Sequence, residues 1–380
     1  MRVVQVSVFQ DPQRRDPDQL FEAWPTLAAV AGAVREAGIE VSVVQAAHRD
    51  ALVERGGVRF QFVGGPQPGV LRRRAGFWAQ ATNERVVNAV QDAKPDVIHF
   101  QSLSFPRDVR GLLNRVRRIP ILLQDHADRP PARLQRLVDR AGMPMVAGAA
   151  FVHRDQALPF VRAGVLAEDV PIFEVPESSS RFVPGDRAAA RAATGLHGDP
   201  CLLWVGRLDP NKDPLTILEA VERAASELPD LTLWCCYTEA PLLRQVEEVL
   251  SKSPLLADRV HLLGRVPHER VQELCRAADF FVLGSHREGS GYSLMEAMAC
   301  GLTPVVTDIP SFRRMTGDGR VGALYPPGDG ARAAALLVEL DRGDRANQAR
   351  SVRAHFERHL SFEAVGRALA GAYRAVAGSP

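Results

Sequence analysis

The chain has 380 residues, of which 46% are hydrophobic and 24% charged, and its formal net charge is +2 at pH 7. This length exceeds the size at which a single hydrophobic core stops growing, so two domains are expected. A net charge this small argues against a nucleic-acid-binding protein, which usually has a strong basic character. No apolar run reaches the length of a membrane span, and residues 1–9 are typical of a strand rather than a secretion signal. We therefore expect a cytoplasmic protein.

The five cysteines all follow residue 200 and form no C-x-x-C pair. Free cysteines behave as small hydrophobic residues, so we expect buried, reduced thiols and neither a disulfide nor zinc. Arginines gather at 72–74 and again between 107 and 118. Each basic residue near an anionic bilayer contributes about 1 kcal/mol, so these segments suit peripheral contact with the inner face of a membrane. A solvated surface is the simpler interpretation.

Strand-like and helical patterns alternate through the first half of the chain. Strands are expected at 3–9, 40–45, 58–63, 97–100, 119–124, 143–152 and 172–175. Helices are expected at 26–37, 77–93 and 107–118. This alternation is typical of a parallel sheet with helices on both faces.

A polar segment bounded by prolines, 176–186, is typical of a linker between domains. The alternation then resumes, with strands expected at 201–205, 231–236, 259–263, 279–283, 303–307 and 321–325. Helices are expected at 187–194, 214–227, 267–277, 292–300, 329–340, 346–359 and 362–377. The sequence thus predicts two α/β domains, residues 1–180 and 181–360, followed by a last helical segment at 361–380.

The stretch 285–301 follows a predicted buried strand and becomes a helix that Gly301 ends. Its loop carries Glu288 and its helix carries Glu296. Backbone N–H groups at the start of a helix lack partners and attract phosphate or sugar oxygens. A carboxylate can accept hydrogen bonds from two vicinal hydroxyls, so these glutamates suit a sugar and a ribose respectively.

Ligands of open parallel sheets bind beyond the carboxyl ends of the strands, so the loops that follow the strands should open on one crevice. The loop after strand 201–205 carries Arg207 and Lys212 beside Gly206. Together with the helix amides after Ser290, these cations would neutralise a diphosphate. Cations for a diphosphate and acceptors for two sugars indicate a nucleotide-sugar pocket.

These residues resemble the signature of the retaining glycosyltransferases of family 4, the glycosyl transferases group 1, which have the GT-B fold. The matching motifs are Glu288 and Glu296 in E-x7-E spacing, Gly206-Arg207-Leu208 with Lys212, Leu263-Gly264-Arg265-Val266, and the helix Met295 to Gly301. The resemblance covers residues 200–330, and more loosely Asp96–His99 and Gln124–His126. It implies two Rossmann-like domains whose parallel sheets face an interdomain cleft, with the last helix packed back on the first domain.

The resemblance also implies a role for each residue. Arg207 and Lys212 would hold the donor diphosphate and stabilise the leaving group, Glu288 would contact the donor sugar, and Glu296 the ribose. His126 would lie near the donor sugar. The backbone at Arg265 and Val266 would read the base. The remaining donor-binding residues would be Gly206 and the segment Ser290, Gly291, Tyr292, Ser293 and Leu294, whose amides would meet phosphate and sugar oxygens.

In such enzymes the new bond is thought to form on the face that the nucleotide leaves, and the leaving phosphate helps to deprotonate the acceptor. No protein nucleophile is then needed, so catalysis rests on positioning and electrostatic stabilisation. The expected partners are a UDP- or GDP-sugar donor and an acceptor that the sequence does not identify, and no metal or other cofactor is expected. Asp16-Pro17-Asp18 imitates a metal-binding D-x-D motif but lies in a proline-rich loop without its supporting context.

Two positions depart from the family pattern. Family members commonly have a glycine-rich turn after the first strand, whereas residues 10–18 contain no glycine; after Thr307, Asp308-Ile309-Pro310 stands where paired glycines are frequent. Two alternatives therefore stay open. One is a nucleotide-sugar epimerase on the same fold, which needs an acid/base pair near the sugar. The other is a non-catalytic nucleotide-sugar-binding protein.

Overall fold

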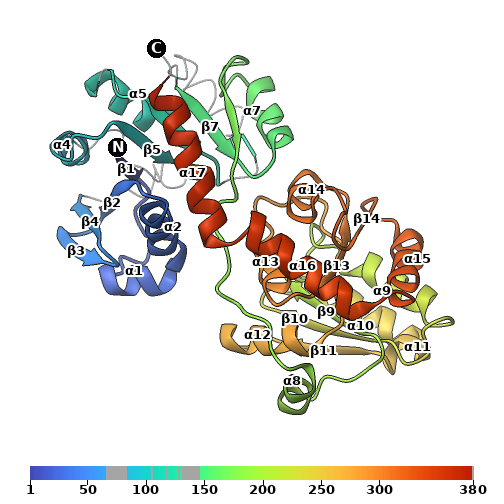
Figure 1. Ribbon diagram of the computed structural model, residues 1–380. Coiled ribbons are helices and arrows are strands. Elements are labelled where there is room, and N and C mark those ends of the chain that lie inside the picture. The colour runs from blue at the N-terminus through green and yellow to red at the C-terminus, as the bar shows by residue number, and fades with distance from the viewer. Residues whose placement is uncertain (66–83, 104–105, 117, 127–128, 131–145, 379–380) are drawn as a thin grey trace. The chain divides into compact units, whose positions relative to one another are not determined.

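A computed structural model describes residues 1–65, 84–103, 106–116, 118–126, 129–130 and 146–378 (Figure 1). The chain divides into two compact units, which we call unit 1 (Met1–Ser178 with Phe362–Pro380) and unit 2 (Ser179–Ser361). The arginines at 72–74 lie outside the described residues, as do parts of the helices expected at 77–93 and 107–118 and of the strand expected at 143–152.

Unit 1 contains an eight-stranded sheet in the order β3-β4-β2-β1-β5-β6-β7-β8. Its strands are β1 (Arg2–Ser7), β2 (Glu40–Ala47), β3 (Ala51–Arg55), β4 (Val58–Gly64), β5 (Val97–Gln101), β6 (Ile121–Gln124), β7 (Gly148–Phe151) and β8 (Ile172–Glu174). All neighbouring strands are parallel except β3, which pairs antiparallel with β4. The parallel sheet predicted for the first half of the chain is therefore confirmed.

The helices of unit 1 come from both ends of the chain. They are α1 (Pro17–Ala23), α2 (Pro25–Glu36), α4 (Glu84–Asp92), α5 (Pro106–Arg115), the 3₁₀ helix η1 (Arg154–Ala157), α7 (Leu158–Arg162) and the last helix, α17 (Phe362–Ala377). Helix α17 packs against α2 and contacts β5 and β6 (Figure 1). The last helix of the chain thus completes the layer that covers one face of the unit 1 sheet.

Unit 2 contains a six-stranded, fully parallel sheet in the order β11-β10-β9-β12-β13-β14. The strands are β9 (Cys201–Gly206), β10 (Thr232–Tyr237), β11 (Val260–Gly264), β12 (Phe280–Leu283), β13 (Thr303–Thr307) and β14 (Ala323–Tyr325). The helices are α8 (Arg187–Thr194), α9 (Pro214–Ala224), α10 (Leu243–Lys252), α11 (Pro254–Ala257), α12 (His268–Ala277), α13 (Tyr292–Ala299), α14 (Pro310–Thr316), α15 (Gly330–Asp341) and α16 (Arg345–His359). This strand order is that of the Rossmann fold.

Both sheets are buried on both faces, as parallel sheets covered by helices must be. Along β1, Val3 belongs to the hydrophobic cluster on one face and Val4 to the cluster on the other. In unit 2 a single cluster includes the fully buried Trp204 and Tyr325. All five cysteines are free, and only Cys300 is partly exposed, which agrees with the expectation for thiols of a hydrophobic core.

Several short elements were not expected from the sequence. Strand β3 has alternating exposed residues, including Leu52 with 61% of its surface exposed, because it forms the outer edge of the sheet. Helix α1 begins at Pro17, within the glycine-free segment 10–18. Asp16 caps this helix by accepting a hydrogen bond from the Gln19 backbone N–H. Asp16 therefore serves as a helix cap, which accounts for the first carboxylate of the Asp16-Pro17-Asp18 triplet.

Candidate functional site

The predicted donor loops follow β9 and β12, two adjacent strands at the centre of the unit 2 sheet. From β9 the strands follow one another in sequence towards β11 at one edge of the sheet, and from β12 they follow towards β14 at the other edge. At such a switch point the loops beyond the carboxyl ends of the two strands leave room for a ligand. The fold thus brings the 206–213 and 284–291 segments to one place, as the sequence predicted.

Direct hydrogen bonds join these two loops. The His286 backbone N–H donates to the Asn211 carbonyl (2.8 Å), and the Asn211 amide donates to the Arg287 carbonyl (3.0 Å). The His286 Nε2 atom lies 3.0 Å from a carboxylate oxygen of Asp213. A Cβ atom at Gly284 would lie 2.6 Å from the Asp213 carbonyl oxygen, so the glycine permits this close approach.

Lys212 and Glu288 form an ion pair between the two loops, and 13% and 12% of their side chains are exposed. The Lys212 backbone N–H donates to the Asp209 carboxylate (2.9 Å), which fixes the start of the lysine side chain. Burial of the pair strengthens its electrostatic interaction because little water screens it. A cation for phosphate and a carboxylate for hydroxyls therefore stand side by side, in mutual contact.

Arg207 lies apart from this pair in its interactions. Its guanidinium contacts the Asp209 carboxylate (3.1 Å) and, at 4.0 Å, that of Glu239, and 48% of its side chain is exposed. The two predicted cations thus have different anionic partners. Gly206 lies beside Lys212: a Cβ atom added at Gly206 would lie 3.2 Å from the Trp204 ring and 3.7 Å from the Lys212 side chain.

Glu296, on α13, accepts a hydrogen bond from His268, the first residue of α12, over 2.6 Å. Burial raises the pKa of Glu296, and His268 opposes part of this shift. His268, which follows the loop after β11, was not predicted from the sequence. Its position directly after the carboxyl end of β11 was the signal that could have identified it.

The start of α13 offers unsatisfied polar groups. Gly291 has φ of 58° at the N-cap, and no side chain caps the helix. The Ser290 hydroxyl is buried and has no hydrogen-bond partner among the described residues. Buried polar groups are normally satisfied, so an unpartnered hydroxyl at the start of a helix is typical of a ligand-binding position.

The other predicted donor-binding residues differ in what they can present. Tyr292 is 45% exposed and Ser293 is half-buried, whereas the Leu294 side chain is fully buried in the core, so only the Leu294 backbone could meet a ligand. In the loop after β11, the Arg265 side chain is exposed and Val266 packs partly against the core. Contact of their backbone with a base stays a prediction.

His126 belongs to unit 1, where it follows β6. Its Nδ1 atom lies 3.1 Å from the Glu177 carboxylate, its Nε2 atom lies 2.5 Å from the Gln101 amide oxygen, and 33% of its side chain is exposed. Burial lowers the pKa of His126, but the hydrogen bond and charge of Glu177, with the charge of Asp125, outweigh burial and raise it. The sequence analysis missed Glu177 and Gln101. The place of His126 near a donor sugar stays a prediction.

The glycine-free loop after β1 is ordered by its own side chains. Asp11 accepts hydrogen bonds from the backbone of Arg15 (2.9 Å) and of Gln13 (3.3 Å) and pairs with the Arg15 guanidinium (3.1 Å). The Gln10 amide donates to the Ala47 carbonyl (3.1 Å). These bonds fix the loop by side-chain contacts where a glycine-rich turn would be fixed by its backbone alone.

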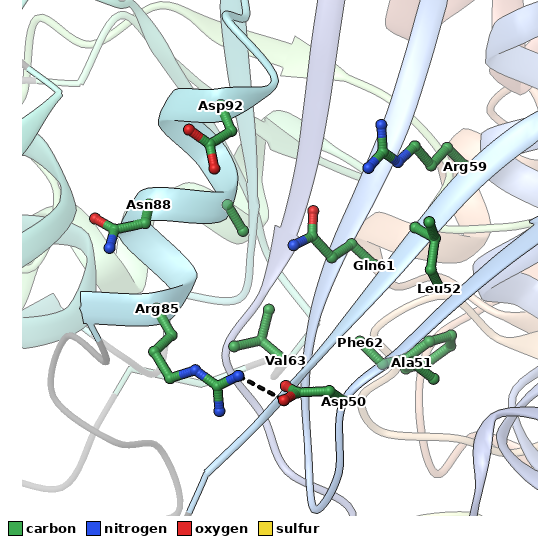
Figure 2. Close-up of a pocket in the computed structure, with 11 residues that line it drawn as sticks. Asp50, Ala51, Leu52, Arg59, Gln61, Phe62, Val63, Arg85, Asn88 and Asp92 are labelled. Carbon is green, nitrogen blue, oxygen red and sulfur yellow. Dashed lines mark hydrogen bonds and ion pairs between the residues drawn. The ribbon is translucent and has the colours of Figure 1, made fainter.

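A pocket of about 460 Å³ that the sequence did not indicate lies on unit 1, between β3, β4 and α4 (Figure 2). At one end the Arg85 guanidinium contacts the Asp50 carboxylate (2.5 Å) and donates to the Gly64 carbonyl (2.9 Å). The polar side chains of its lining also include Arg59, Gln61, Asn88 and Asp92. Two arginines and two aspartates balance in charge, so the lining favours neither an anion nor a cation, and it contains none of the predicted site residues.

Within the described parts of the chain, no group of three or more histidine, cysteine, aspartate or glutamate side chains has the arrangement of a metal site. No described helix is long and apolar enough to cross a bilayer.

Comparison with known proteins shows that most of unit 2 is similar to transferases. Residues 186–354 match the model of the family "Glycosyl transferases group 1". The D-inositol 3-phosphate glycosyltransferase of Geodermatophilus obscurus is 37% identical over 166 residues, which are 41% of this chain and 37% of that protein. That of Mycolicibacterium gilvum is 32% identical over 207 residues, 52% of this chain and 44% of that protein. The chain thus matches less than half the length of these curated relatives.

Solved structures extend the likeness to both units. The sucrose-phosphate synthase of Thermosynechococcus elongatus has a TM-score of 0.68 at 19% identity, with 98% of each chain covered. Anabaena HepE in complex with UDP has a TM-score of 0.67 at 18% identity, with 98% of this chain and 100% of that chain covered. At these identities the likeness concerns the fold, which is the predicted GT-B fold. Residues 186–354 therefore match the glycosyl transferases group 1, and the fold of the chain is the GT-B fold of these solved structures.

Proposed function

We propose that the protein is a retaining, metal-independent glycosyltransferase that moves a hexose from a UDP- or GDP-sugar to an acceptor. The observation that carries this proposal is the meeting of Lys212 and Glu288 at the switch point of the unit 2 sheet. A buried ion pair costs more to desolvate than an apolar pair would, so stability alone does not account for it. A donor would account for it: its diphosphate interacts with Lys212, and its sugar hydroxyls donate to Glu288.

The groups around this pair support the same donor. Glu296 can accept from the two ribose hydroxyls, and the backbone at the start of α13, with the unpartnered Ser290 hydroxyl, suits phosphate oxygens. Arg207 adds a half-exposed cation. The backbone after β11, at Arg265 and Val266, would read the base.

UDP is favoured over GDP as the nucleotide. Anabaena HepE was solved with UDP and with UDP-glucose, and a trehalose-6-phosphate protein from E. coli with a TM-score of 0.67 was solved with UDP-2-fluoro glucose. The family model covers residues 186–354, which lie in unit 2, and the D-inositol 3-phosphate glycosyltransferase of Geodermatophilus obscurus matches over only 41% of this chain. Its acceptor is therefore not carried over to this chain.

The chemistry follows from the residues available. As the bond between the anomeric carbon and the phosphate oxygen breaks, negative charge develops on the diphosphate. Lys212, Arg207 and the α13 amides would stabilise that charge, and one such donor contributes about 3 kcal/mol or more in characterised enzymes. The departing phosphate takes the acceptor proton as the new bond forms on the same face, which retains the anomeric configuration without a protein nucleophile.

The proposal is tested by supplying UDP-glucose, and GDP-mannose in parallel, with a panel of sugar, polyol phosphate and lipid-linked acceptors. Transfer in the presence of EDTA, with a product whose anomeric proton signal matches the donor configuration, is the expected result. Interconversion of sugar nucleotides without an acceptor would instead indicate the epimerase. Nucleotide binding without transfer to any acceptor or hydrolysis would indicate the non-catalytic binding protein.

A further inference from the structure

A continuous chain of hydrogen bonds crosses unit 1 from its first strand, through the last helix, to the candidate histidine. It starts at Gln5 on β1, passes to Tyr373 on α17 and then to His99 and Gln101 on β5. It ends at His126, in the loop after β6, and at Glu177, after β8. Its contacts in that order measure 3.3, 2.7, 3.4, 2.5 and 3.1 Å. The chain of bonds thus links residues that lie 368 positions apart at its first step.

The atoms at the His126 end define its protonation. The Glu177 carboxylate can only accept a hydrogen bond from Nδ1, and the Gln101 amide presents its oxygen, which also only accepts, to Nε2. Both ring nitrogens therefore need a proton. A neutral imidazole has only one, so this pair of partners fits an imidazolium.

The orientation of the Gln101 amide is set by His99 on its other side. The Gln101 N–H group faces His99 Nε2, which must then be an unprotonated acceptor, and the proton of His99 lies on Nδ1, where it donates to the Tyr373 hydroxyl oxygen. His99 is fully buried, and burial, with the neighbouring His126, lowers its pKa to about 3. His99 is therefore a neutral ring, held by Tyr373, by Gln101 and by a side-chain hydrogen bond with Gln124.

We propose that Tyr373, His99 and Gln101 are positioning residues that hold His126 as an imidazolium with both N–H groups engaged. The charged and titratable groups that face His126 are Glu177, Asp125 and His99, and only the first two favour the cation. This inference rests on the proposed function for its consequence: with a proton on both ring nitrogens, His126 cannot act as a base for the acceptor in the transfer reaction. Tyr373, on the last helix of the chain, thereby contributes to the charge of His126.

The test reads the rings directly, without turnover. Long-range ¹H–¹⁵N spectra of histidine-labelled protein distinguish the imidazolium and both neutral tautomers, and signals are assigned with His126→Asn and His99→Gln. In the wild-type protein at pH 7, we expect His126 with protons on both nitrogens and His99 with its proton on Nδ1. In Tyr373→Phe, His99 should move its proton to Nε2, and the proton affinity of His126 should fall about tenfold, the effect of one hydrogen bond to a charged group.

Two further variants keep the result interpretable. Gln101→Leu, which removes the amide without touching the buried helix, should lower the proton affinity of His126 in the same direction. Tyr325→Phe is the matched control: it removes a buried tyrosine hydroxyl that donates to the Leu283 carbonyl (2.8 Å) in unit 2, and His126 should titrate as in the wild type. A neutral His126 at pH 7, or an unchanged His126 titration in both Tyr373→Phe and Gln101→Leu, would overturn the proposal.

The pH profile of transfer separates this inference from the proposed function. If wild-type protein transfers sugar, the fall in activity at alkaline pH should begin at a lower pH in Tyr373→Phe than in wild type. The acid limb of the pH profile should stay the same. An alkaline side that stays in place would contradict the inference while the function stands. A protein with no transferase activity, but with the expected histidine spectra, would contradict the function and leave the hydrogen-bond chain intact.

Discussion

Lys212 and Glu288 lie 76 positions apart in the sequence and form an ion pair with only about an eighth of each side chain exposed. The pair exists because β9 and β12 are neighbours at the centre of the unit 2 sheet. In the absence of a ligand each charge neutralises the other. A nucleotide-sugar would replace this single contact by two, from phosphate to Lys212 and from sugar hydroxyls to Glu288.

Replacing Lys212 by alanine should reduce kcat/KM for transfer by 10²–10³-fold, about 3–4 kcal/mol of transition-state stabilisation, because one donor aimed at the leaving phosphate is lost. Glu288→Gln should reduce it as well, because the amide accepts sugar hydroxyls less strongly than a carboxylate. Steady-state kinetics with UDP-glucose measure both effects, and thermal unfolding shows whether the variants stay folded.

The control for Lys212 is Lys252→Ala. Lys252 also pairs with a glutamate of unit 2, Glu248, but 72% of its side chain is exposed and the pair lies one turn apart on α10. Such exposed pairs contribute little, so kcat/KM should stay within a factor of two of wild type. Equal losses in the two lysine variants would mean that Lys212 acts through general charge rather than through the donor.

The raised pKa of Glu296 predicts that its ionised carboxylate lowers the stability of the fold in a pH-dependent way. A raised pKa means that the folded protein holds the proton more tightly than the unfolded chain, so the stabilisation is complete below the ordinary value of 4.5 and is lost as pH rises through the raised pKa. At pH 8, Glu296→Gln should therefore unfold at the same temperature as wild type or higher. UDP binding by the same variant should weaken, because the amide accepts the ribose hydroxyls less well. A variant less stable than wild type at pH 8 would contradict the desolvation argument.

The raised pKa of His126 affects stability in the same direction as that of Glu296, but over a different pH range. Its interaction with Glu177 stabilises the fold fully below the ordinary pKa of 6.5 and ceases to do so as pH rises through the raised value. The stability difference between wild type and His126→Gln should thus be larger at pH 6 than at pH 9. Chemical denaturation at both pH values measures it. A difference that grows with pH would show that the neutral ring, not the cation, is the stabilised form.

Gly291→Ala should destabilise the protein and displace the start of α13. Its φ of 58° strains an alanine, and the new Cβ would lie 2.7 Å from Cε1 of Phe312, so we expect a loss of about 1–3 kcal/mol. Gly32→Ala in α2 is the matched control, with no atom within 4 Å of the added Cβ. It should gain about 0.5–1 kcal/mol, because alanine favours a helix interior over glycine. Urea denaturation of the two variants gives both values.

Much of unit 2 and its donor loops could be predicted from the sequence. In unit 2, strand β13 and helix α8 have the predicted bounds, and in unit 1 so does α17. Glu288 and Lys212 were predicted to share a site from their places after parallel strands. Their direct ion pair was not, since the contact depends on the bonds of Asn211 to His286 and Arg287, which no local pattern encodes.

The partners in unit 1 were the least predictable. His126 was identified through a family resemblance. Gln101 and Glu177 reach His126, and Tyr373 reaches His99, only because the fold of unit 1 brings together elements that lie far apart in the sequence. Strand β3 was missed because an exposed edge strand lacks the continuous apolar run of its buried neighbours. Contacts between elements far apart in the sequence thus account for most of what the sequence left open.

The central claim, that the switch point of unit 2 binds a nucleotide-sugar through Lys212 and Glu288, is tested most directly by calorimetric titration of wild type and Lys212→Ala with UDP, GDP and ADP. We predict that wild-type protein binds UDP more tightly than GDP or ADP and that Lys212→Ala binds UDP at least tenfold more weakly. Equal UDP affinity in the two proteins, or no binding of any of the three nucleotides by the folded wild type, would contradict the claim.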